Sequence, residues 1–232
     1  MILYAIPTPL GGAPEDALPA SALKIIRSLR DFVVEDAKSA RAFLSAAGCK
    51  PRELQLSELS EHTPAADVPA LLQPLRDGRA LGLLSEAGCP AIADPGAALV
   101  EAAQREGFRV VPLIGPSSIV LALMASGLEG QRFAFCGYLP RDATERAGRI
   151  KQLEQRSRRE RETEIFIETP YRNDALLSAL LETCAPGTRL CVAADLTLGS
   201  ESVKTQTIAD WRRARTNLGK RPAVFLLLAE HR

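Results

Sequence analysis

Two loops made of small residues and prolines are the segments of this sequence best suited to hold a small molecule. The first, SEAGCPAIADPG, begins at Ser85 after the apolar run ALGLL, which is typical of a buried strand. The second, IGPSSIVLALMASG, begins at Ile114 after another apolar run and puts Ser117 and Ser118 where a helix would start. Backbone N–H groups and hydroxyls at such strand ends bind ligands in open α/β sheets.

The amino terminus adds a third loop of the same kind. IPTPLGG follows a short apolar run and places prolines and glycines directly after a strand. Any one of the three loops could be an ordinary strand-to-helix turn, since Gly, Pro and Ser punctuate every α/β fold. Together they predict a ligand-binding crevice. The sequence contains neither a GxGxxG fingerprint nor a GxxxxGK[ST] loop, so the usual dinucleotide and phosphate sites lack their signatures.

Over about residues 1–201 the chain resembles the tetrapyrrole-methylase-like superfamily of S-adenosylmethionine-dependent methyltransferases. The resemblance is carried by IPTPLGG, VEDAKSARAFL, LLSEAGCPAIADPG, VVPLIGPSSIVLALMASGL, FAFCGYLPR and IFIETPYR. It is greatest to the branch that methylates ribose 2′-hydroxyls of ribosomal RNA. The resemblance implies two α/β domains, S-adenosylmethionine in a cleft between them, a homodimer and ribosomal RNA as the substrate.

The resemblance also implies which residues contact the cofactor. They are backbone groups and small side chains of the three loops, together with two residues of the second domain that would flank the adenine: Pro9, Leu10, Gly11, Ser85, Ala87, Ile92, Ala93, Ser117, Ser118, Tyr138 and Leu139. Glu86 and Asp94 would attract the sulfonium or amino group. Asp94, which precedes a proline, is equally well explained as a turn residue or helix cap.

Two further clusters are candidates for the substrate side. In VEDAK, Asp36 is expected to contact the acceptor hydroxyl, and Lys38 to lower the pKa of that hydroxyl or hold a phosphate. Asp36 is equally well placed to cap the following helix. In ETPYR, which contains Glu168, Tyr171 is expected to stack on a base and Arg172 to hold a phosphate.

These substrate motifs depart from the ribosomal RNA branch. EDAK stands in place of EDTR, EHT in place of an HNE-like element, TPYR in place of SPHR and ADLTL in place of RELTK. Two alternatives therefore stay open, methylation of a small molecule such as a tetrapyrrole, and a cofactor-binding module without catalysis. The charge run from Arg141 to Glu164 predicts a solvated helix with internal ion pairs or a phosphate contact.

Composition places the chain among ordinary globular proteins. Its 232 residues are 46% hydrophobic and 25% charged, and 29 Lys and Arg against 28 Asp and Glu give a net charge of +1, so an RNA substrate would need a local basic patch. The five cysteines are far apart, which suggests neither disulfides nor a metal site and fits a reducing cytoplasm. No signal peptide or membrane span is expected.

Alternating apolar and amphipathic segments predict an α/β fold with two domains, 1–115 and 116–232. The first has strands near residues 2–6, 32–34, 80–84 and 109–113 separated by helices, which favours a mostly parallel sheet. Residues 65–76 are predicted as one helix despite Pro69 and Pro74. The second has strands near residues 133–137, 164–168, 190–194, 202–207 and 224–229, and sparse helices among the last three favour a mixed sheet.

Overall fold

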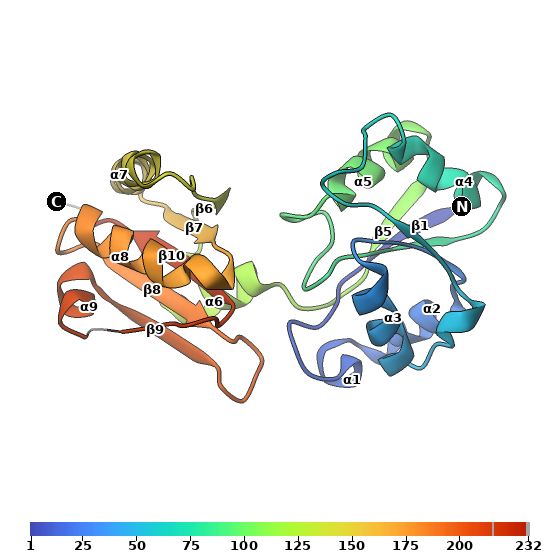
Figure 1. Cartoon of the computed structure of the whole chain (residues 1–232), viewed down its shortest axis with the longest axis horizontal. Helices are drawn as coiled ribbons and strands as arrows, with labels where there is room; N and C mark the ends of the chain where they lie inside the picture. Colours follow the sequence, from blue (N-terminus) through green and yellow to red (C-terminus); the bar gives the residue numbers. More distant parts are fainter. Residues whose placement is uncertain (215, 231–232) are drawn as a thin grey trace. The chain divides into compact units, whose positions relative to one another are not determined.

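The computed structural model describes residues 1–214 and 216–230 and consists of two compact units, Met1–Ser117 and Ser118–Arg232. Each unit is built on one five-stranded sheet with helices packed against it (Figure 1). The predicted α/β class is confirmed, with a parallel first sheet and a mixed second sheet.

The sheet of the first unit has the order β3-β2-β4-β1-β5, and all its neighbouring strands are parallel. The strands are β1 (Ile2–Ile6), β2 (Asp31–Val34), β3 (Gln55–Glu58), β4 (Leu81–Leu84) and β5 (Arg109–Pro112). Because parallel strands run in one direction, all of their carboxyl ends lie at one edge of the sheet. We call this edge the acidic edge, because the residues that follow its strands include Glu35, Glu61, Glu86 and Asp94.

Helices cover both faces of this first sheet, as Figure 1 shows. One face packs against α2 (Ala20–Ser28) and α3 (Ala37–Ala46), around Ile6, Phe32 and Leu44, and α1 (Pro14–Ala17) contacts α2. The other face packs against a 3-10 helix, η2 (Val68–Leu72), and against α4 (Gln73–Arg76) and α5 (Gly96–Arg105). Burial on both faces explains why β4 and the residues of β2 after Asp31 are apolar.

Two sequence predictions about this unit were wrong or incomplete. The helix expected over residues 65–76 is divided into η2 and α4, because Pro69 and Pro74 each occupy the start of a helical segment and cannot donate a backbone hydrogen bond. The edge strand β3, preceded by the 3-10 turn η1 (Pro51–Glu53), was missed. Its sequence, QLSE, has a single apolar residue and so lacks an alternating pattern.

The sheet of the second unit has the order β6-β7-β10-β8-β9, in which only β6 and β7 are parallel neighbours among the described residues. Its strands are β6 (Phe133–Tyr138), β7 (Thr163–Ile167), β8 (Arg189–Ala194), β9 (Ser202–Thr207) and β10 (Ala223–Leu228). The antiparallel register opposes Val224 to Ile167, so the segment after β7 and the segment before β10 meet at one edge.

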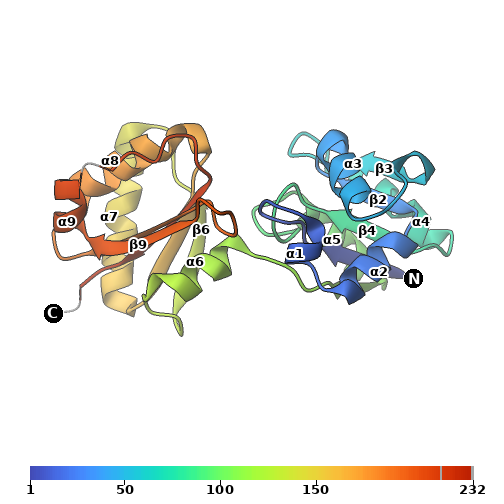
Figure 2. The same cartoon turned by 90° about the horizontal axis from the view of Figure 1, so that it is seen from below.

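The helices of the second unit lie on both faces of its sheet. α7 (Ala143–Glu160), α8 (Asn173–Thr183) and α9 (Ile208–Ala214) share one core cluster that includes Phe166, Phe225 and Trp211. α6 (Ser118–Ser126) packs on β8, β9 and β10 from the other side (Figure 2). A 3-10 turn, η3 (Pro170–Arg172), leads into α8.

Candidate functional site

The loops after β1 and β4 are joined by a short antiparallel bridge at the acidic edge. The Thr8 N–H donates to the Gly88 carbonyl at 2.9 Å, and the Gly88 N–H returns a bond to the Thr8 carbonyl at 3.1 Å. The buried Ser85 hydroxyl donates to the Gly88 carbonyl at 2.7 Å. The third and the first of the predicted ligand loops, IPTPLGG and SEAGCPAIADPG, are therefore held in a fixed relation to each other.

The loop after β5 is packed against the same pair. The Cys89 thiol donates to the Pro116 carbonyl at 3.4 Å. Gly115 lies so close to the loop after β1 that a Cβ at this position would stand 2.5 Å from Cβ of Pro7. Any side chain there would push the two loops apart, so glycine is required. All three loops predicted from sequence thus form one cluster.

The backbone between β4 and α5 is strained. Ala91 and Ala93 both have left-handed conformations, with φ of 66° and 56°. Such a conformation costs a residue with a Cβ about 1–2 kcal/mol. The Asp94 carboxylate supports the turn, since its Oδ1 accepts the Ala91 N–H at 3.0 Å and the Gly96 N–H at 2.6 Å. Ile92, held between the two alanines, is 48% exposed, as expected for a residue displayed toward a ligand.

Carboxylates gather at this edge from three different loops. Burial raises the pKa of the half-buried Glu35, and the negative charges of Asp94 and Glu86 raise it further, while the Glu86 N–H opposes the shift. Burial also raises the pKa of Asp94, against the two N–H groups that it accepts. Glu61, from the loop after β3, adds to the repulsion on Glu35. The edge is therefore suited to a cationic ligand.

Asp36 has the helix-capping role that the sequence left open. It is the N-cap of α3, and its Oδ1 accepts the Ser39 N–H at 2.7 Å. That backbone bond lowers the pKa of the Asp36 carboxyl, with help from the Ser39 hydroxyl. The side chain is exposed, as is that of Lys38 in the first turn of the helix. Glu35, which the sequence did not favour, is the carboxylate at the end of β2 that adjoins Asp94 and Glu86.

The structure gathers most of the predicted cofactor residues in the first unit. The three loops carry Pro9, Leu10, Gly11, Ser85, Ala87, Ile92, Ala93 and Ser117. Three others belong to the second unit. Ser118 is the first residue of α6, and Tyr138 ends β6 with 55% of its surface exposed. The Leu139 side chain is buried in the core of that unit, so only its backbone is available to a ligand.

The second unit has its own cluster of polar residues, at the edge where β7 ends and β10 begins. Glu168 is buried, and its Oε1 accepts the Thr169 N–H at 2.6 Å and a guanidinium N–H of Arg172 at 2.5 Å. The Arg172 guanidinium is therefore paired with a buried carboxylate, and its expected contact with a phosphate stays a prediction. The next carboxylate along the edge, Asp195, is paired with Arg221 at 2.6 Å.

The described residues contain no cluster of three or more His, Cys, Asp or Glu side chains that could hold a metal ion. None of the helices described is long and apolar enough to cross a membrane.

The fold and these loops define a methylase. Residues 3–211 match the family of tetrapyrrole (corrin/porphyrin) methylases, and the chain belongs to that family. It is a methyltransferase, and its cofactor is S-adenosylmethionine. The left-handed turn at Ala91 and Ala93, the backbone donors of three glycine-rich loops and the nearby carboxylates fit a ligand with a positive sulfonium and many hydrogen-bonding groups.

Among curated proteins the chain is similar to several called ribosomal RNA small subunit methyltransferase I. The relative from Vibrio cholerae is 31% identical over 229 residues, which cover 97% of this chain and 76% of that protein. The relative from Xylella fastidiosa is 35% identical over 207 residues, 89% of this chain and 72% of that protein. The relative from Bacillus subtilis is 31% identical over 211 residues, 90% and 68% of the two chains.

Solved structures of more distant methyltransferases share the fold. The methyltransferase CobJ superposes with a TM-score of 0.65 at 18% identity, covering 98% of this chain and 93% of that one. The uroporphyrin-III-C-methyltransferase from Thermus thermophilus gives a TM-score of 0.58 at 22% identity, covering 98% and 94%. At these identities the similarity establishes the architecture alone.

Proposed function

We propose that this methyltransferase acts on small-subunit ribosomal RNA and transfers the methyl group to a ribose 2′-hydroxyl. The observation that carries this proposal is the similarity, over 89–97% of the chain, to relatives named for methylation of that RNA. The ribose as the acceptor rests on the resemblance of the VEDAK, SEAGCP and GPSS motifs to the 2′-O-methylating branch. An RNA substrate of this kind would place the enzyme in the cytoplasm.

The acidic edge is the proposed site of the cofactor. Bound S-adenosylmethionine supplies an electrophilic methyl group on a positively charged sulfur. N–H groups of the three loops would bind its polar groups, and Ser117 and Ser118 would add hydroxyls at the start of α6. The carboxylates of Glu35, Glu86 and Asp94 would favour the positive charge of the bound cofactor. Tyr138 and the Leu139 backbone are proposed to flank the adenine.

The acceptor hydroxyl must lose its proton as its oxygen forms a bond to the methyl carbon. We propose Glu35 as the proton acceptor in place of Asp36, the residue expected from sequence. The backbone bond that lowers the pKa of Asp36 makes this carboxylate a weaker base and uses it as a helix cap. Burial and neighbouring negative charges make Glu35 a stronger base, and it adjoins the cofactor loops. Lys38 remains a proposed contact for the acceptor.

Two measurements, made one after the other, test the proposed function. Isothermal titration with S-adenosylmethionine, and with the demethylated product, should show binding that EDTA does not change. Tritiated methyl groups should then pass from the cofactor to small-subunit ribosomal RNA from a strain lacking the gene. Label in a tetrapyrrole instead would contradict the RNA substrate, whereas cofactor binding without transfer to any acceptor would indicate a non-catalytic module.

We also propose that the protein is a homodimer. α6 exposes Val120 by 48% and Met124 by 75%, and the edge strand β6 exposes Phe133 by 45%. Apolar side chains displayed on a helix and on an edge strand favour association with a second copy. Light scattering should give twice the chain mass for the wild type and a smaller mass for Met124→Glu. A monomeric wild type would contradict the proposal.

A further inference from the structure

Two side chains that are far apart in the sequence lie together at the polar edge of the second unit. Tyr171, in the turn η3, has 79% of its surface exposed. The ammonium nitrogen of Lys220, in the loop before β10, lies 5.2 Å from the centroid of the Tyr171 ring. The antiparallel pairing of β7 with β10 brings these two segments to the same edge.

The loop that carries Lys220 is fixed by side chains at the start of α8. The Asp174 carboxylate accepts the Leu218 N–H at 2.7 Å and the Gly219 N–H at 3.2 Å. On the other side of Lys220, the buried Asn173 amide donates to the Arg221 carbonyl at 2.7 Å. The backbone on both sides of the lysine is thus tied to the helix that follows Tyr171, so the segments that carry the two residues are fixed to each other.

The acidic residues near this pair are already neutralised or hydrogen bonded. Glu168 is paired with Arg172, and Asp195 is paired with Arg221 and also accepts the Ser200 hydroxyl at 2.9 Å. Asp174 bonds the two backbone N–H groups described above. Within the part of the chain that the structure describes, Lys220 itself makes no ion pair. Its charge therefore stays available to an anion.

We propose that Tyr171 and Lys220 form a nucleotide-binding pair, in which the tyrosine ring stacks on a base of the RNA and the lysine ammonium binds a neighbouring phosphate. An exposed aromatic ring beside a cation is suited to a single-stranded nucleotide, which offers a flat base and a negative backbone. Lys220 takes the phosphate role that the sequence suggested for Arg172. The proposal rests on the proposed RNA substrate and assigns it a contact surface.

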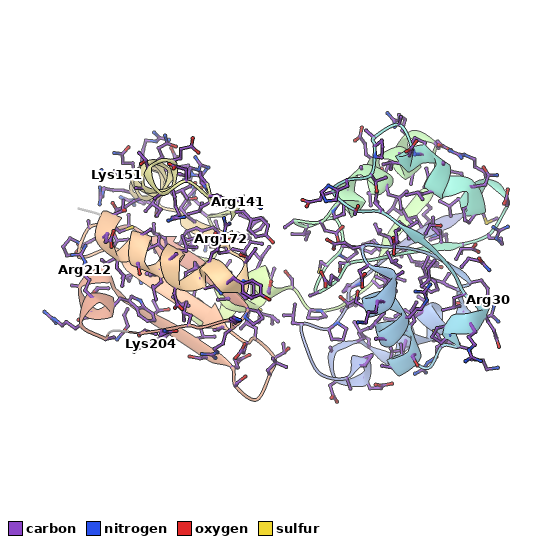
Figure 3. All side chains as sticks on the ribbon, in the orientation of Figure 1. Arg30, Arg141, Lys151, Arg172, Lys204 and Arg212 are labelled. Carbon is purple, nitrogen blue, oxygen red and sulfur yellow. The ribbon has the colours of Figure 1, made fainter. Side chains whose placement is uncertain are left out.

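The chain contains a matched control for this pair. Lys204, labelled on β9 in Figure 3, lies 5.3 Å from the centroid of the Trp211 ring. The distance from cation to ring is nearly the same as in the Tyr171–Lys220 pair, but Trp211 is only 2% exposed and its N–H donates to the Leu190 carbonyl at 2.8 Å. A buried ring cannot stack on a base. Replacing Lys204 therefore removes a lysine over an aromatic ring without removing a nucleotide site.

The test is binding of a fluorescent single-stranded oligoribonucleotide of small-subunit ribosomal RNA sequence. Tyr171→Ala should weaken binding by roughly 5- to 150-fold, the range for loss of one stacked base, whereas Tyr171→Phe should bind like the wild type. Lys220→Met should make the negative slope of log K against log salt less steep by about 0.7, the value for one phosphate contact with a single strand. Lys204→Met should leave affinity and slope unchanged.

Cofactor titration of each variant checks that its fold is intact. Wild-type RNA affinity in both Tyr171→Ala and Lys220→Met, with methyl transfer to RNA by the wild type established, overturns the binding pair while leaving the proposed function in place. An equal loss in Lys204→Met also overturns it, because the effect would then be one of general charge. A wild-type enzyme that neither binds nor methylates RNA overturns both proposals.

Discussion

The two units present opposite chemistry at the edges of their sheets. In the first unit the carboxylates of Asp94 and Glu86 repel that of Glu35 at the loops that follow parallel strands. In the second unit the buried carboxylates Glu168 and Asp195 are each paired with an arginine. The two edges differ in whether the acids are paired with arginines. This difference is why we propose the first edge for the cationic cofactor and the second for a negatively charged nucleic acid.

The sharpest way to break this comparison is to neutralise Glu35. Glu35→Gln keeps the shape of the side chain but removes its ability to accept a proton, so kcat should fall by roughly 10²- to 10⁴-fold. Cofactor affinity should fall much less, because the carboxylates of Glu86 and Asp94 remain. Asp36→Asn is the adjacent control and should be nearly as active as the wild type, because Asn also caps helices. A large loss in Asp36→Asn and none in Glu35→Gln would return the catalytic role to Asp36.

The packing of the three loops is tested by Gly115→Ala. The added Cβ would lie 2.5 Å from Cβ of Pro7. Relief of such a clash typically costs about 1–3 kcal/mol, so we expect cofactor affinity to fall by roughly 5- to 150-fold. Gly148→Ala, where the new Cβ has nothing within 4 Å, should bind the cofactor normally and raise Tm. Normal affinity in Gly115→Ala would mean that the cofactor does not depend on this loop.

The serines at the start of α6 are expected to have a smaller effect. Ser117→Val and Ser118→Val each remove a hydroxyl proposed to bind the cofactor, at a cost of about 1 kcal/mol, or roughly fivefold in affinity. Calorimetric titration measures this loss, and thermal unfolding measures any change in stability. Unchanged affinity with a lower Tm would make the two residues helix caps only.

The smallest expected effect is a shift in pH dependence. A general base acts only when deprotonated, so activity should be lost as the pH falls through the raised pKa of Glu35. Asp94→Asn removes the negative charge that raises the pKa of Glu35 most. The asparagine oxygen can still accept the N–H groups of Ala91 and Gly96. The pKa of Glu35 should fall, and the acid limb of the kcat profile should move to lower pH. An unmoved limb would assign that limb to another group.

Sequence patterns predicted those parts of the candidate site that each lie within one short segment of the chain. Apolar runs followed by Gly, Pro and Ser identified the loops after β1, β4 and β5, and parallel strands place such loops at one edge. The choice between Glu35 and Asp36 depended on where β2 ends. Because the strand stops at Val34 and Asp36 already caps α3, the alternation of side chains along a strand no longer applies to them.

Contacts between segments that are far apart along the chain could not be predicted from the sequence. Tyr171 and Lys220 are brought together by the pairing of β7 with β10, and nothing in the loop around Lys220 marks it locally. The same holds for Gly88 and Thr8, whose bridge joins two loops 80 residues apart in the chain. Such contacts need the order of strands in the sheet, which apolar periodicity does not provide.

The position of the transferred methyl group tests the central claim most directly. Small-subunit ribosomal RNA labelled by the enzyme with tritiated S-adenosylmethionine is hydrolysed completely in alkali and separated by charge. A 2′-O-methyl group removes the neighbouring hydroxyl that attacks the phosphodiester, so our account predicts that the label remains in an alkali-stable dinucleotide. Label in mononucleotides would indicate methylation of a base and would contradict the account.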